Sequence, residues 1–171
     1  MLMDLSVVVP CYNEEESLKA LHKRLKATCE DAAVKSYEII LVNDGSKDQT
    51  LTYMKELAGT DPNLVIINLS RNHGHQLALS AGLSEAKGDY IFVLDADLQD
   101  PPELLHDMLE MARSGVDVVY GQRVRRAGET WFKLFMSSAF YRVLSYMSDT
   151  EIPENVGDFR LMSRRVLDTL L

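Results

Sequence analysis

The 171-residue sequence lacks the patterns that mark several common protein classes. Its two cysteines, Cys11 and Cys29, make neither a disulfide framework nor a zinc pattern, and they fit a reducing compartment. It has no basic-then-apolar leader and no run of about 18 apolar residues, so neither a signal peptide nor a membrane-spanning helix is predicted. A net charge of −8 argues against broad electrostatic attraction to nucleic acid.

Three motifs of nucleotide and ester chemistry are also missing. No G-x-G-x-x-G follows the first apolar run, and G-x-x-x-x-G-K-[ST] and G-x-S-x-G occur nowhere. These absences argue against a usual dinucleotide enzyme, a P-loop NTPase and a hydrolase with a serine elbow. The hydrophobic content of 46% is ordinary, so we expect one domain with a real core.

Short apolar runs alternate with helical patterns along the first 120 residues. This βαβ rhythm predicts an α/β fold, with a mostly parallel central sheet covered by helices on both faces. Ligands of such sheets bind above the carboxyl ends of the strands, where the polar loops of this chain fall. Strands are predicted at 5–10, 38–42, 64–69, 90–94 and 116–120, and helices at 18–30, 50–58, 76–86, 103–113 and 164–171, with Gly88 ending the third helix.

The fourth predicted strand ends in two carboxylates, Asp95 and Asp97, and the amide of Gln99 follows two residues later. If the backbone stays extended there, both carboxylates point to the same side. Few oxygen ligands on a loop suit Mg²⁺ or Mn²⁺ shared with substrate phosphates, whereas the alternative is a solvated acidic turn. The segment from Asp100 to Glu103 resembles a helix start, with Asp100 as the N-cap.

Other polar side chains at the strand ends are candidates for binding a nucleotide. Glu14 and Asp44 can accept hydrogen bonds from a base or ribose, and Tyr12 can stack on a base, but Asp44 can also simply shape its Asp-Gly turn. His73 and His75 have no third metal-binding partner nearby in the sequence, so we do not expect them to form a metal site.

The pattern changes after residue 121. Residues 122–128 form a basic loop that includes Arg123, Arg125 and Arg126, and these arginines are candidates for an anionic substrate or simply a solvated loop. Residues 131–147 are rich in aromatic side chains, and their pattern predicts a helix. We expect core and partner-facing surface there, with an apolar ledge beside a membrane as the alternative.

Five segments together resemble family 2 glycosyltransferases with the three-layer, Rossmann-like GT-A fold. The resemblance is strongest to the polyprenyl-phosphate branch, that is, undecaprenyl-phosphate (bactoprenol) glucosyltransferases and dolichol-phosphate mannose synthases. The segment NVGDFRL at 155–161 favours this branch, since polysaccharide synthases carry a Q-x-x-R-W-type motif that this chain lacks. The segments are VVPCYNEE at 8–15, VNDGSKD at 42–48, SRN at 70–72, DADLQDPPE at 95–103 and NVGDFRL at 155–161.

The resemblance implies a role for each matched position. Asp158 matches the position often proposed as the catalytic base, and Arg123 would lie near the acceptor phosphate or donor diphosphate. Arg160 is a further candidate, because an acceptor phosphate needs a cation. Family members commonly have Lys-Glu where this chain has His75-Gln76, which puts any donor contact there in doubt. The nucleotide-sugar residues would be Pro10, Tyr12, Glu14, Asp44 and Asp95, and the ligands of Mg²⁺ or Mn²⁺ would be Asp95, Asp97 and Gln99.

The resemblance also implies an activity. We expect an inverting hexosyltransferase that moves glucose, from UDP-glucose or next GDP-mannose, to a polyprenyl phosphate at the cytoplasmic face of the membrane. The alternatives are a soluble family 2 transferase with a glycan or protein acceptor, and a nucleotide-sugar-binding module without turnover. The sequence leaves open the donor, the lipid, the metal and the oligomer.

We expect one catalytic domain over 1–171. Within it, 1–121 is the nucleotide-binding half and 122–171 is an acceptor-side part. Relatives usually continue into amphipathic or transmembrane helices, so we expect this chain to be truncated at its C-terminal end, with a short natural form as the alternative.

Overall fold

The computed structural model describes residues 3–122 and 156–171. Contacts divide the chain into two units, residues 1–119 with 158–171 and residues 120–157. The core and the candidate site belong to the first unit. The predicted division into a nucleotide-binding half, 1–121, and an acceptor-side part, 122–171, concerns function, and it stays a prediction.

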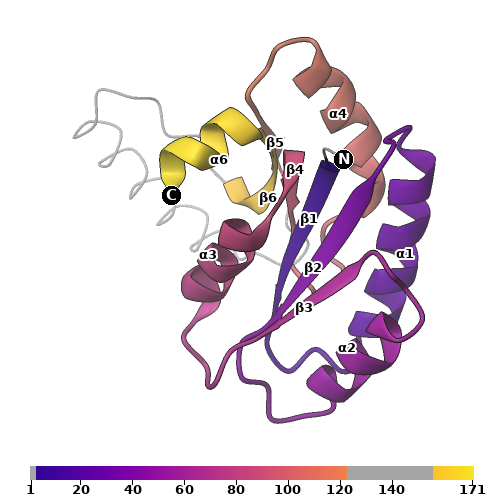
Figure 1. Ribbon diagram of the computed structural model, residues 1–171, viewed down its shortest axis with the longest axis vertical. Coiled ribbons are helices and arrows are strands. Elements are labelled where there is room, and N and C mark those ends of the chain that lie inside the picture. Colours follow the sequence, from indigo (N-terminus) through magenta and orange to yellow (C-terminus); the bar gives the residue numbers. More distant parts are fainter. Residues whose placement is uncertain (1–2, 123–155) are drawn as a thin grey trace, which may run out of the picture. The chain divides into compact units, whose positions relative to one another are not determined.

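A six-stranded sheet in the order β3-β2-β1-β4-β6-β5 forms the centre of the fold (Figure 1). β1 pairs in parallel with β2 and β4, and β2 with β3, which confirms the predicted mostly parallel α/β sheet. β6 was not predicted as a strand, and it runs antiparallel to β4. The strands are β1 (Met3–Cys11), β2 (Tyr37–Asn43), β3 (Leu64–Asn68), β4 (Gly88–Val93), β5 (Val118–Gln122) and β6 (Val156–Ser163).

Helices cover both faces of the sheet, as predicted. α1, α2 and α4 pack on one face, and α3 and α6 pack on the other (Figure 1). No helix in the described residues is long and apolar enough to cross a membrane. The helices are α1 (Leu18–Asp31), α2 (Thr50–Ala58), α3 (His75–Glu85), the short 3-10 helix η1 (Pro102–Leu104), α4 (Leu105–Arg113) and α6 (Arg164–Leu170).

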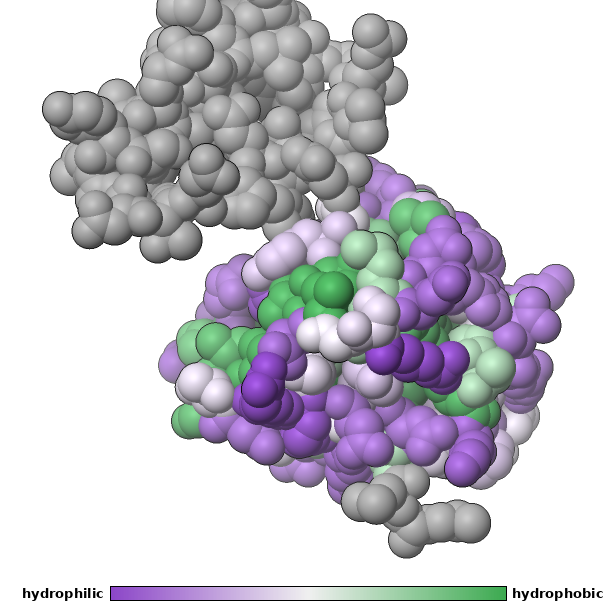
Figure 2. Space-filling model, turned by 90° about the horizontal axis from the view of Figure 1, so that it is seen from above, coloured by the Kyte–Doolittle hydropathy of each residue, from purple (hydrophilic) through white to green (hydrophobic). Residues whose placement is uncertain are grey.

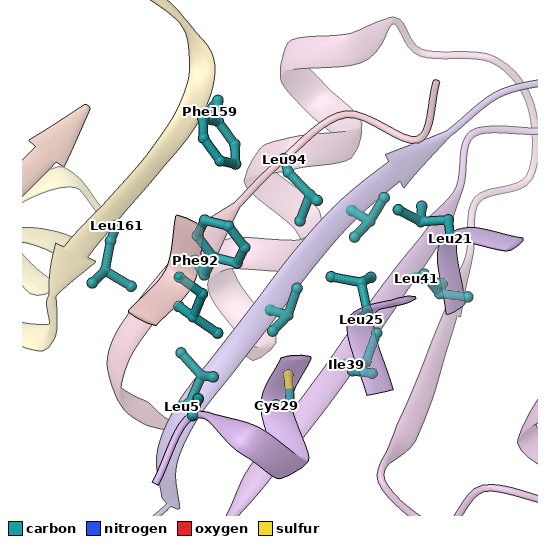
Figure 3. Close-up of a cluster of buried hydrophobic side chains, with 14 of the residues drawn as sticks. Leu5, Leu21, Leu25, Cys29, Ile39, Leu41, Phe92, Leu94, Phe159 and Leu161 are labelled. Carbon is teal, nitrogen blue, oxygen red and sulfur yellow. The ribbon is translucent and has the colours of Figure 1, made fainter. Parts of the chain in front are cut away.

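The strands bury apolar side chains on both faces, because successive residues of a strand point to opposite sides. Val7 and Val9 of β1 join the cluster under α1 and α4, whereas Val8 joins the cluster under α3. Figure 3 shows part of the first cluster, where Phe92 of β4 faces Phe159 of β6. Their ring centroids lie 5.3 Å apart in an edge-to-face arrangement, so β6 shares the core of the parallel strands.

Both cysteines are free thiols buried in this first cluster. Burial raises the pKa of Cys29 to about 12, with smaller contributions from the charges of Asp61 and Glu30. Burial also raises the pKa of Cys11, helped by the charge of Glu14. The thiols therefore behave as small apolar side chains of the core.

Two local predictions were wrong. The helical segment after Asp100 begins with η1, whose N-cap is Pro101, so Asp100 is not the cap residue. Gly88 does not end α3 in a left-handed conformation, because α3 ends at Glu85 and Gly88 is already the first residue of β4. A side chain at Gly88 would lie 2.4 Å from the backbone nitrogen of Ser6, so this glycine permits a close approach of β4 to β1.

The surface of the described residues is mainly polar on the face that Figure 2 presents. Apolar side chains appear there in a few separate areas between hydrophilic ones. Scattered exposed apolar residues are normal for a folded domain and do not by themselves mark a binding surface.

Candidate active site

Polar loops follow β1, β2, β3 and β4 at their carboxyl ends. These four strands are neighbours in the sheet and run in parallel, so their loops line one edge of it. β6 reaches the same edge from the opposite direction, because Val93 near the end of β4 pairs with Arg160. Asp158 precedes Arg160 by two residues and therefore lies beside the end of β4.

The loops after β1 and β2 are joined by hydrogen bonds. The Asn13 amide donates to Ser46 Oγ at 3.0 Å, and the Lys47 amide donates to Asn13 Oδ1 at 2.8 Å. The Glu14 amide donates to Thr50 Oγ1 at 2.8 Å. Asn13 has a φ of 57°, a left-handed conformation that asparagine tolerates better than most residues. The two loops thus form one connected edge of the site.

Three of the predicted nucleotide-binding residues lie on this edge. Pro10 is buried within β1, where it pairs with Val42 of β2. Tyr12 is 39% exposed, which leaves its ring open to a stacking partner. Glu14 Oε2 accepts a hydrogen bond from Ser17 Oγ at 2.7 Å, so its carboxylate is held near the start of α1.

Asp44 is almost fully buried and binds the backbone of the next loop. Its Oδ1 accepts from the His73 amide at 2.7 Å, and its Oδ2 accepts from the Gly74 amide at 3.0 Å. The adjacent Gly45 has a φ of +66°, and a side chain there would lie 2.4 Å from the backbone carbonyl carbon of Arg71. Asp44 and Gly45 therefore fix the loop between β3 and α3, a structural role different from shaping the Asp-Gly turn, and nucleotide binding by Asp44 stays a prediction.

The backbone does not stay extended through Asp95 and Asp97. β4 ends at Val93, and the chain turns at Ala96 and Asp97. Asp97 is exposed, and its Oδ1 accepts from the Gln99 amide at 3.0 Å. The expected alignment of the two carboxylates by strand geometry was therefore wrong, and the turn sets their orientation.

Asp95 has the electrostatics of a cation-binding carboxylate. Its pKa is raised, first by burial and further by the charges of Asp97, Asp158 and Asp100, while His75 lowers it. Its Oδ1 is buried without a hydrogen-bond partner in the described part of the chain. An unpartnered buried carboxylate oxygen fits a divalent cation, which would supply the missing partner.

The described residues contain no preformed cage for such an ion. No group of three or more His, Cys, Asp or Glu side chains within 3–122 and 156–171 is arranged to hold a metal. An ion bound through Asp95 and Asp97 would thus take most of its ligands from water and from a bound substrate. Magnesium sites with few protein ligands and substrate phosphates are built in this way.

Asp158 lies at the centre of a small polar network. Its Oδ2 accepts from His75 Nε2 at 2.8 Å and from Gln76 Nε2 at 3.1 Å. Its Oδ1 lies 3.7 Å from Nη1 of Arg160. His75 Nε2 also lies 3.6 Å from Asp95 Oδ1, so one imidazole faces both carboxylates.

Sequence reasoning found Asp95, Asp158 and Arg160 but assigned no role to His75 and Gln76. Two features of the sequence could have pointed to a role for them. The pair lies at the start of the helix after the third strand, and it replaces the Lys-Glu that is common in the family. That His73 and His75 form no metal site stays a prediction. Arg123, Arg125 and Arg126 lie outside the described residues, as does the aromatic stretch at 131–147.

Comparison with known proteins assigns the family. The family described as "Glycosyl transferase family 2" matches residues 6–171. The chain belongs to this family. The resemblance seen in the five sequence segments is thereby confirmed.

Curated members of the family match nearly the whole chain. An uncharacterized glycosyltransferase of Synechocystis is 46% identical over 99% of the chain and 53% of its own length. A prophage bactoprenol glucosyl transferase homolog of Escherichia coli is 41% identical over 98% of the chain and 55% of its own length. The bactoprenol glucosyl transferase of Shigella phage SfV is 40% identical over 98% of the chain and 54% of its own length. The chain thus spans about half the length of these relatives.

Solved structures of glycosyltransferases share the fold. Staphylococcus aureus TarS 1-349 in complex with UDP-GlcNAc has a TM-score of 0.67 and 22% identity, over 98% of this chain and 47% of that one. The Pyrobaculum calidifontis mannosyltransferase PcManGT in complex with GDP-Man and Mn²⁺ has a TM-score of 0.61 and 22% identity, over 97% and 46%. The predicted GT-A fold is confirmed, and at this identity the similarity concerns the fold alone.

Proposed function

We propose that this chain is the catalytic part of a metal-dependent, inverting hexosyltransferase that moves glucose from UDP-glucose to a polyprenyl phosphate. The acceptor follows from relatives named bactoprenol glucosyl transferase at about 40% identity, and glucose follows from the same names. Transfer would take place at the cytoplasmic face of a membrane, through contacts made outside the described residues. GDP-mannose is the second candidate donor.

One observation carries the proposal: Asp95 and Asp158 meet at the same edge of the sheet, although 63 positions separate them in the sequence. The antiparallel pairing of β6 with β4 puts the two carboxylates side by side, and His75 contacts both. This arrangement suits a single displacement, with Asp95 near the ion of the donor diphosphate and Asp158 near the anomeric carbon.

The chain's own residues divide the work. Asp95 and Asp97, with Gln99, would hold Mg²⁺ or Mn²⁺ against the diphosphate. The edge formed by Pro10, Tyr12 and Glu14 would hold the nucleotide, beside the loop that Asp44 fixes. The cation supplies compensation for the negative charge that the leaving diphosphate gains as the anomeric bond breaks.

The acceptor needs a positive partner more than it needs a base. A phosphate monoester already carries close to two negative charges at neutral pH, because its second pKa is about 6. Arg160 points a guanidinium at this part of the site, and its Nε is buried without a hydrogen-bond partner among the described residues. Arg160 and Arg123 are therefore our candidates for binding the acceptor phosphate. Asp158 would orient the reacting group or stabilise positive charge at the anomeric carbon.

A binding screen tests the donor and the metal together. Calorimetry with UDP-glucose, UDP-GlcNAc and GDP-mannose, each with and without Mn²⁺, should give Mn²⁺-dependent binding of UDP-glucose. Asp95→Asn should weaken that binding by about tenfold or more, since a contact to the ion is lost. Asp89→Asn is the matched control, because Asp89 is an exposed carboxylate of β4, the strand that precedes Asp95.

An acceptor assay then tests the activity. Transfer of labelled glucose to undecaprenyl phosphate, with saccharides offered in parallel, should give product only with the lipid. Product on a saccharide instead would favour a glycan-directed transferase. Donor binding with neither transfer nor donor hydrolysis would favour a binding module without turnover. Binding that is indifferent to both Mn²⁺ and Asp95 would refute the proposed metal site.

A further inference from the structure

The carboxylate of Asp158 is held from outside its own strand. Asp158 lies near the start of β6, and its side chain is 22% exposed. Both hydrogen bonds to its Oδ2 come from the first two residues of α3, His75 and Gln76. These residues lie more than 80 positions away in the sequence, so the contact exists only in the folded chain.

The start of α3 is itself fixed by the end of β2. Asp44 binds the amides of His73 and Gly74, the two residues immediately before α3. Gly74 is the N-cap of α3 and has a φ of +93°, a conformation that a glycine adopts without strain. Because Asp44 is nearly fully buried, this anchor has little freedom. His75 is therefore presented to Asp158 from a rigid loop.

The two bonds constrain one oxygen of Asp158 and leave the other turned to a different partner. Oδ2 takes both donors, whereas Oδ1 faces the guanidinium of Arg160. His75 Nε2 also lies 3.6 Å from Asp95 Oδ1, so the same imidazole contacts both carboxylates. The arrangement fixes the rotation of the Asp158 carboxylate and its distance from Asp95.

We propose that His75 and Gln76 are positioning residues that orient the Asp158 carboxylate for glycosyl transfer, through a helix start that Asp44 anchors. The inference rests on the proposed function, in which Asp158 acts on the reacting sugar or acceptor. It assigns a task to the His-Gln pair that stands where the family commonly has Lys-Glu. Neither residue needs to touch the nucleotide for this role.

Kinetics of matched variants test the inference. His75→Ala should lower kcat by about 10- to 100-fold, because catalysis is sensitive to small displacements of a reacting group. The KM for the nucleotide sugar and its Mn²⁺-dependent affinity should stay within about twofold, as expected for loss of an effect confined to the transition state. His75→Gln keeps a nitrogen donor near the place of Nε2 and should restore most of kcat. Ser84→Ala, an exposed hydroxyl later in α3 that bonds the Ala81 carbonyl, is the control and should change nothing.

A double-mutant cycle separates positioning from general damage. In an Asp158→Asn background, His75→Ala should lower kcat by less than about threefold, because its target is already gone. An equal loss in both backgrounds would overturn the proposal. A loss of donor affinity as large as the loss of kcat would also overturn it, since His75 would then be a donor-binding residue.

Nuclear magnetic resonance gives a readout that does not need activity. The Nε2 resonance of His75 in the 171-residue chain should shift on Asp158→Asn and stay in place on Ser84→Ala. If wild-type protein transfers no glucose to undecaprenyl phosphate but this shift is present, the proposed function fails and the positioning contact stands. If the chemical shift of His75 Nε2 does not change on Asp158→Asn, the positioning role is refuted, whether or not the protein is active.

Discussion

Outside the site, Asp61 is a charged residue that is almost fully buried, with 2% of its surface exposed. Its Oδ2 lies 2.9 Å from Nε2 of the buried His22, and its Oδ1 accepts from the Asn63 amide at 3.0 Å. Burial pushes the pKa of Asp61 up, but these hydrogen bonds and the charges of Lys26 and His22 outweigh it, so the pKa is lowered. The carboxylate ties α1 to the turn before β3.

A lowered pKa in the folded state makes this contribution depend on pH in one direction. The stabilisation is present above the unfolded-state pKa of about 3.9 and is lost as the pH falls through the lower, folded-state value. We expect Asp61→Asn to lower the free energy of unfolding by about 1–3 kcal/mol at pH 7, because the buried His22 loses a charged partner. The deficit relative to wild type should shrink below about pH 4, where wild type begins to lose the same interaction.

Urea denaturation of both proteins at pH 7 and through the acid range measures this difference. Asp89→Asn is a suitable control, since Asp89 is exposed. A deficit for Asp61→Asn that stays constant down to pH 3 would contradict the assignment of the effect to the Asp61 charge.

At the scale of elements, the close packing of α3 on the sheet depends on a glycine. A Cβ at Gly82 would lie 2.4 Å from Val8 Cγ1 and 2.9 Å from Val42 Cγ2. The contacted atoms belong to buried, β-branched side chains of β1 and β2, which have little room to move. Gly82 therefore lets α3 lie close against two central strands.

We expect Gly82→Ala to destabilise the fold by about 1–2 kcal/mol. Overpacking a core costs about 1–3 kcal/mol, and the better helix propensity of alanine offsets up to about 1 kcal/mol. Gly59→Ala is the matched control, because its Cβ would meet only backbone oxygens at 3.4 Å and 3.6 Å. Equal unfolding midpoints for Gly82→Ala and wild type would refute the close-packing argument.

At the scale of the whole molecule, β1 lies in the interior of the sheet. It is hydrogen-bonded to β2 on one side and β4 on the other, and Val7, Val8 and Val9 are fully buried. β3 stands at one end of the strand order among the described strands, and its Val65 is 37% exposed. Stability is thus distributed from the centre of the sheet outward.

Amide hydrogen exchange should follow this order. The amides of residues 7–9 should exchange only with global unfolding, whereas outward-facing amides of β3 should exchange at least about tenfold faster through local opening. Exchange measured by nuclear magnetic resonance or mass spectrometry at neutral pH tests the order. Protection of β3 equal to that of β1 would mean that further chain covers this end of the sheet.

The parallel half of the fold was predictable because its signals are local. Each buried strand is a continuous apolar run, and each polar loop follows one, so the edge that carries Asp44, Asp95 and Asp97 could be inferred. The strand β6 was missed although its apolar residues, Phe159 and Leu161, alternate with the charged Asp158 and Arg160, a period of two that is typical of a strand with one buried face. Such a segment becomes a strand only when it pairs with β4.

The sequence by itself determined the alternation of elements, the two-sided core and the family, because these depend on hydrophobic period and on short motifs read within a few residues. Only the tertiary structure decided that Asp158 lies beside Asp95 and that His75 and Gln76 hold it. Those contacts join segments 63 to 83 positions apart, and their geometry follows from strand register and from the anchor at Asp44. No local pattern specifies which distant donor a carboxylate will meet, since that depends on how the strands pair.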